Sequence, residues 1–279
     1  MIRLFLAAIT LLFATASAQA SDVRLSVTEV TDARSTGPFN NGMEMKLKLT
    51  GDDVASVKGI RTVLTKAVDE TGRNLLKDEK QDKDFGSVRD SGTGPETTLR
   101  LKNPARRAAT VKEIAGEVQM FMPDLDPASV VMVRNFRAAT GKPLKNLQLA
   151  KAGLQVTVLS KAEYDVLSKQ KEQEAGEKVG KNLGQAMVQA FKGMFGGFFR
   201  VGDNDLILKL ADSGEVFITA EVVDGTGHVV PTVSTTYGDD MRVLGFEHPL
   251  PADAQLRIFL KTPKSVVTVP VKLVDIPLP

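Results

Sequence analysis

The sequence predicts a mainly β protein with two β-sandwich-like, immunoglobulin-like (Ig-like) regions that are joined by an amphipathic helical connector. The first observation is a series of short segments, such as residues 43–49, in which polar and apolar side chains alternate. That alternation places one face of a strand in a core and the other in water. The second observation is a proline-free stretch rich in Glu, Gln, Lys and Ala that begins near residue 161. It interrupts the strand pattern once and predicts a helix.

The first predicted β region covers residues 21–160. Turn residues such as Asn41-Gly42 and Asn103-Pro104 separate its apolar segments. Many short strands at regular spacing are typical of a β-sandwich or barrel. The expected strands are residues 23–30, 43–49, 59–68, 97–102, 111–121, 129–133, 144–149 and 154–159.

The predicted connector covers residues 161–200. Ser160 and Glu163 have the spacing of a capping box, in which each side chain satisfies a backbone amide of the other residue. The strand pattern then returns in a smaller second region, residues 201–279. Its expected strands are residues 206–210, 215–223, 228–233, 242–246, 255–260 and 266–274.

The two β regions share a turn sequence. Asp69-Glu70-Thr71-Gly72 and Asp224-Gly225-Thr226-Gly227 each follow an apolar segment. Asp-x-Thr-Gly favours a hairpin in which the glycine takes a positive φ. The similarity suggests, without establishing it, that one region is a duplicate of the other.

The first twenty residues have the order of a secretory signal peptide. Arg3 lies in a basic start, residues 4–13 are apolar, and two overlapping small-x-small sites end at Ala20. The apolar run is too short to span a bilayer. We therefore expect an exported protein, in the bacterial periplasm or outside the cell. Because the chain has no cysteine, we expect no disulfide framework and no lipid anchor.

Charge argues against binding to nucleic acid. The net charge is only +2, and acidic and basic residues are interleaved along the chain. Such a balance produces no long-range field toward phosphate, and the sequence lacks a basic stripe with interleaved aromatics.

Three segments carry a resemblance to a group of known proteins. Residues 99–106, residues 114–118 and the ending at residues 269–279 are similar to segments of uncharacterised exported bacterial β-sandwich proteins. The resemblance implies a β-sandwich fold and export, and it implies no activity.

The residue types needed for catalysis are sparse. The only histidines are His228 and His248, which lack a metal-ligand spacing, and no Gly-x-Ser-x-Gly elbow occurs. Paired acids, as at Asp203 and Asp205, complete no calcium-loop motif. We therefore predict no catalytic, cofactor-binding or metal-binding residue. The absence of Trp also argues against carbohydrate platforms.

One face of the connector is the predicted interaction surface. On a helical wheel, small and large apolar residues share one arc. They are Gly176, Gly180, Leu183, Gly184, Met187, Phe191, Met194, Phe195 and Phe198. This face fits packing on the chain's own β regions, pairing with a protein partner or a second copy, or contact with a membrane surface.

The leading hypothesis is an exported, non-catalytic envelope or extracellular protein that acts in protein–protein interaction or assembly. One alternative is a secreted hydrolase with a carboxylate or metal site between the two β regions. The other is a peripheral membrane protein that uses the apolar face of residues 183–199.

Overall fold

The computed structural model describes residues 23–35, 41–51, 53–77, 84–90, 94–180, 201–238 and 240–279. The described part of the chain is 49% strand and 15% helix, arranged as four antiparallel sheets, which confirms the predicted mainly β class. The expected leader, residues 1–20, lies outside the described residues.

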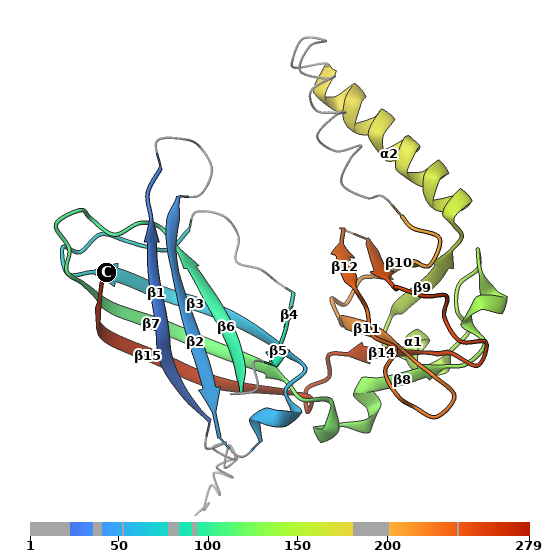
Figure 1. Cartoon of the computed structure of the whole chain (residues 1–279), viewed down its shortest axis with the longest axis horizontal. Helices are drawn as coiled ribbons and strands as arrows, with labels where there is room; N and C mark the ends of the chain where they lie inside the picture. The colour runs from blue at the N-terminus through green and yellow to red at the C-terminus, as the bar shows by residue number, and fades with distance from the viewer. Residues whose placement is uncertain are drawn as a thin grey trace, which may run out of the picture.

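Two of the sheets pack face to face, and we call them the first sheet pair (Figure 1). One has the order β1 (Arg24–Ala33), β2 (Gly42–Thr50), β6 (Pro95–Leu101) and β5 (Arg89–Asp90). The other has the order β15 (Val266–Pro277), β7 (Thr110–Phe121), β3 (Gly59–Asp69) and β4 (Gly86–Ser87). Inward-facing residues of β2 and β6 meet those of β3, β7 and β15, and the shared core includes Met43, Met45, Leu99, Leu101, Ala67, Val111, Ile114 and Ile276.

The other two sheets form the second sheet pair. One has the order β12 (Ser234–Tyr237), β13 (Met241–Gly245), β10 (Leu206–Asp212) and β9 (Leu154–Leu159). The other has the order β11 (Phe217–Val223), β14 (Gln255–Leu260) and β8 (Val130–Val133). Their core includes Val156, Leu208, Leu244, Val222, Leu256, Ile258 and Val131.

The two pairs share one strand order. β1, β2, β6 and β5 of the first pair correspond in order to β9, β10, β13 and β12 of the second. In the facing sheets, β15, β7 and β3 correspond to β8, β14 and β11. The turn similarity noted in the sequence is therefore part of a likeness that extends over both sheets.

Each half of the chain places its last strand in the other sheet pair. β8 follows β7 along the chain but pairs with β14, whereas β15 follows β14 but pairs with β7. The registers correspond, because Val266 lies opposite Phe121 and Val130 lies opposite Phe259. Sheet membership therefore differs from the sequence expectation of regions 21–160 and 201–279. Pairing depends on residues far apart in the chain, which a linear pattern does not reveal.

An apolar cluster joins the two pairs where the strands cross over. The Phe121 ring meets the Phe259 ring edge to face, with centroids 6.0 Å apart, and Phe85 and Ile218 complete the cluster. Beside it, Thr262 Oγ1 donates to Asp126 Oδ2 over 2.7 Å. The two crossover segments thus touch each other through corresponding positions.

The Asp-x-Thr-Gly turns form as predicted. Gly72 has φ +84° and Gly227 has φ +90°. Asp69 is fully buried, and its carboxylate accepts from the amides of Thr71, Arg73 and Ala105 and from the Thr71 hydroxyl. Burial raises the pKa of this carboxyl, but the hydrogen bonds lower it by more, so the pKa lies below its ordinary value. Asp224 repeats the bonds to the turn and is half-buried.

The helices are short apart from one. They are η1 (Val54–Ser56), η2 (Pro123–Leu125), η3 (Pro127–Ser129), η4 (Phe136–Ala139), α1 (Leu147–Lys151) and α2 (Lys161–Gly180). The capping box at the start of α2 is confirmed, because Glu163 Oε2 accepts from the amide and the hydroxyl of Ser160. Tyr164, in the first turn, is buried against the outer face of the β12-β13-β10-β9 sheet, and Leu167 packs beside it. Figure 1 shows the rest of α2 projecting from the second sheet pair.

Two expected strands are wrong. Residues 144–149 were expected to be extended, but α1 begins at Leu147 because the Asn146 side chain accepts from the amides of Gln148 and Leu149. Residues 228–233 contain only an isolated bridge at Val229, and the strand β12 begins at Ser234. Pro231 has no amide to donate to a strand ladder.

Candidate functional site

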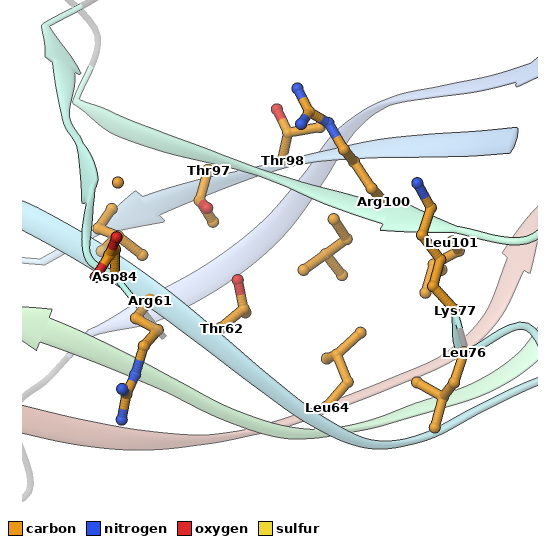
Figure 2. Close-up of a pocket in the computed structure, with 13 residues that line it drawn as sticks. Arg61, Thr62, Leu64, Leu76, Lys77, Asp84, Thr97, Thr98, Arg100 and Leu101 are labelled. Atoms are coloured by element: carbon orange, nitrogen blue, oxygen red, sulfur yellow. The ribbon is translucent and has the colours of Figure 1, made fainter. Parts of the chain in front are cut away.

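A groove of about 380 Å³ lies between β3 and β6, on one side of the first sheet pair (Figure 2). The two strands belong to opposite sheets, and each has only a two-residue strand on its outer side. β4 pairs with β3 at Gly59 and Ile60, and β5 pairs with β6 at Pro95 and Glu96. We call this space the β3–β6 groove. The volume lies within the range of small-ligand and peptide sites.

Strand alternation determines which side chains line the groove. On β6, Thr97, Leu99 and Leu101 point inward, whereas Thr98 and Arg100 are exposed on the outer face. On β3, Ile60 is buried, Thr62 is half-buried, and Leu64 packs against the core of the first sheet pair. The floor of the groove is therefore apolar, whereas the surface that stays accessible in it is more polar than apolar.

Two threonines contribute to this polar surface. Figure 2 shows Thr62 and Thr97 pointing toward one another from opposite sheets. Both are half-buried, and neither hydroxyl has a hydrogen-bond partner among the described residues. Solvent still reaches both hydroxyl oxygens, because neither is among the buried side-chain polar atoms that lack a hydrogen-bond partner. A bound molecule that covers them would have to offer polar groups midway along its length in place of water.

The charged residues around the groove differ in whether they are already paired. Arg61 donates from Nε and Nη2 to Gln119 Oε1 over 3.0 and 2.6 Å, and Figure 2 shows it pointing away from the groove. Arg100 Nε lies 3.3 Å from Glu44 Oε1 on the outer face, and Asp84 Oδ2 lies 3.6 Å from Arg242 of the second pair. Lys77 is exposed and has no carboxylate partner among the described residues. Lys77 is thus the cation left for a ligand at this groove.

The corresponding place in the second sheet pair is filled. Arg242 of β13, the strand that corresponds to β6, lies opposite the buried Leu208. The Arg242 guanidinium lies 5.7 Å from the Phe217 ring of β11 and 5.2 Å from the Tyr237 ring of β12. Arg242 is only 9% exposed, and its Nη1 donates to the carbonyls of Gly238 and Met241. A side chain therefore bridges β13 and β11 where the first pair has a groove.

The predicted interaction surface is described only at its start. Gly176 and Gly180 lie in the last turns of α2, where side chains are not described. The other members, Leu183, Gly184, Met187, Phe191, Met194, Phe195 and Phe198, lie outside the described residues.

The histidines and paired acids weighed in the sequence do not line the groove. His228 is exposed, and its Nδ1 lies 2.7 Å from the Thr226 hydroxyl in the Asp224 turn. His248 is exposed as well. Asp203 pairs with Lys161, and Asp205 accepts from the Gly202 amide. Within the described part of the chain, no group of three or more metal-ligating side chains converges.

Comparisons of the chain with protein-family models, with curated proteins and with solved structures find no match. Among the described helices, none is long and apolar enough to cross a membrane.

Sequence reasoning missed the β3–β6 groove. The alternation of Thr97 among leucines predicts an inward threonine, but it does not show that the facing sheet stands away from it. One sequence signal did point to the strand exchange. Residues 127–133 and 263–269 agree in the pattern Pro-x-Ser-Val-Val-x-Val, and both serines are fully buried.

Proposed function

We propose that this chain is an exported, non-catalytic protein that binds another protein through the β3–β6 groove. The observation that carries the proposal is the pair of facing threonines, Thr62 and Thr97, which have no hydrogen-bond partner among the described residues and lie in a groove with an apolar floor. Convergent polar groups in a concavity with an apolar floor are typical of binding sites.

The second sheet pair supports this interpretation. It has the same strand order, but Arg242 bridges the corresponding place with Phe217 and Tyr237. The strand order by itself therefore does not require a groove. The groove leaves surface of the first sheet pair unburied, and the second sheet pair folds without such a groove. Binding therefore explains the groove better than folding does.

Three finer statements belong to the same proposal. Each sheet pair is a β-sandwich of the Ig-like kind, as the resemblance to exported bacterial β-sandwich proteins implies. Residues 1–20 are a signal peptide, and the mature protein acts in the periplasm or outside the cell. Residues 161–200 form an amphipathic connector whose apolar face is a second contact surface.

A site-specific crosslink tests the groove. A photo-reactive side chain is placed at Thr97 of the protein in the cells that make it, with the half-buried Thr236 of β12 as the matched control position. Illumination should give adducts of discrete mass from position 97 that protease digestion removes, and none from position 236. Adding Thr62→Trp should fill the groove and abolish the adducts. Absence of adducts at position 97, or adducts that survive protease, would contradict the proposal.

A further inference from the structure

We infer that the partner enters the β3–β6 groove as an extended peptide segment that adds a strand to β6 and places a carboxylate beside Lys77. This inference rests on the proposed function and names the kind of partner. Extended peptides bind open sheet edges through main-chain hydrogen bonds, with alternate side chains in pockets.

The first support is the open edge of β6. Glu96 faces β5 across its pair with Arg89, and the Lys102 amide donates to Leu75 on the same side. Backbone groups alternate in direction along an antiparallel strand, so those of Thr98 and Arg100 also face away from β2. No described strand pairs with β6 between Thr98 and Arg100 on that side. An added strand would satisfy these amides and carbonyls.

The second support is the position of the groove's polar groups. A hydrocarbon chain lying in the groove would cover the hydroxyls of Thr62 and Thr97 without offering them a hydrogen bond. That arrangement costs roughly 1–3 kcal/mol for each buried group. A peptide has amides and carbonyls along its length, so it can match hydroxyls in the middle of the site. The threonines therefore favour a peptide over an acyl chain.

The third support is charge. Arg61, Arg100 and Asp84 already have partners, whereas Lys77 at one end of the groove has none among the described residues. An exposed ammonium without a carboxylate partner among the described residues favours a ligand with a carboxylate at that end of the groove. Leu64, Leu76, Leu99 and Leu101 line the space that alternate apolar side chains of the peptide would occupy.

The test uses two ten-residue synthetic peptides of alternating Val and Thr, one with a single Glu at its N-terminal end and the other with a single Glu at its C-terminal end. Calorimetry measures their binding to the purified protein. At least one of them should bind, and we call the tighter binder the Glu peptide. Two N-methylated versions of the peptide are compared, one with the odd-numbered amides methylated and one with the even-numbered amides methylated. The version in which methylation removes the donors that face β6 should bind more than tenfold more weakly. The other version should change binding less than threefold. This period-two response is the signature of an added strand.

Two matched variants test whether the Lys77 charge contributes to peptide binding. Lys77→Gln should weaken binding of the Glu peptide about three- to tenfold and should leave a Gln peptide unchanged. Lys272→Gln, on the exposed face of β15, serves as the control and should have no effect.

Three results would overturn the inference: no binding by either peptide at millimolar concentration, equal loss in both methylation phases, or equal binding after Lys77→Gln. Any of these results together with protease-sensitive adducts at position 97 would leave the groove as a protein-binding surface and refute only the added strand. Loss of the adducts would refute the proposed function itself.

Discussion

The first and second sheet pairs share a strand order and a turn, and they differ in how one side is closed. In the second pair, Arg242 bridges β13 and β11, and its Nε is buried without a hydrogen-bond partner. In the first pair, a groove remains between the corresponding strands β6 and β3. The shared strand order therefore accounts for the common arrangement of the sheets, whereas it does not determine whether a groove forms on this side.

The turns show the same contrast on a smaller scale. Asp69 accepts a fourth bond, from the Ala105 amide, which ties its turn to the segment before β7. At the corresponding place of the second pair, Asp253 lies so close to Gly225 that a Cβ there would be 2.1 Å from Asp253 Oδ2. The Asp69 turn thus anchors its surroundings, whereas the Asp224 turn is mainly closed on itself.

The largest expected effect comes from separating the halves. A cut between Lys145 and Asn146 leaves β1–β8 on one fragment and β9–β15 on the other, so each sheet pair lacks a strand. The first pair would lose the buried Val271 and Ile276, and such losses are comparable to a whole domain's stability of about 5–15 kcal/mol.

Circular dichroism melts of each fragment, alone and mixed, measure this effect. Neither fragment alone should melt cooperatively, and the mixture should regain a single cooperative transition. A cooperative melt by either fragment alone would show that the exchanged strands are dispensable.

Loss of the buried turn carboxylate should have the next largest effect. Asp69→Asn keeps the shape but weakens four hydrogen bonds to a buried anion, so we expect a loss of about 2 kcal/mol or more. Asp224→Asn should lower stability in the same direction and by less, because Asp224 is half-buried. Urea unfolding at neutral pH compares the two variants, and equal losses would contradict the difference between the turns.

The same carboxylate has a pH signature. Because hydrogen bonds lower the folded-state pKa of Asp69, its contribution is fully present above the unfolded-state value of about 3.9. The contribution is lost as the pH falls from there through the folded-state pKa. The stability of wild type and Asp69→Asn should therefore converge at acid pH, and a constant difference down to pH 2 would refute the assignment.

Removing the Arg242 side chain from the second sheet pair should lower stability by less than the loss of the Asp69 carboxylate. Arg242→Ala removes the side chain that bridges β13 and β11, and we expect a loss of about 1–3 kcal/mol. Arg242→Leu keeps a large apolar side chain at this position and removes a buried Nε without a partner, so it should cost much less than the alanine. Thermal unfolding of the two variants measures this difference, and the reverse order would show that charge rather than packing closes the second pair.

The smallest effect is expected at the groove itself. Thr62→Val replaces a hydroxyl that solvent reaches by a methyl group, so we expect a change in stability of no more than about 0.5 kcal/mol. The variant should also bind the Glu peptide more weakly. Unchanged peptide binding would mean that the hydroxyl has no role in recognition.

Much of the fold follows from local sequence patterns. Alternation predicted most strands, the Ser160–Glu163 spacing predicted the start of α2, and Asp-x-Thr-Gly predicted both turns. Segments 144–149 and 228–233 were mistaken for strands because Asn146 and Pro231 determine the backbone there. The strand exchange and the groove depend on contacts between distant segments, so the alternation of residues along one strand does not predict them.

Hydrogen exchange of backbone amides, with and without the Glu peptide, tests the central claim most directly. We predict added protection at Thr98 and Arg100 of β6 and no change along β13, the corresponding strand of the second pair. Protection that appears equally on β13, or that is absent from β6, would contradict the assignment of the binding edge to the first sheet pair.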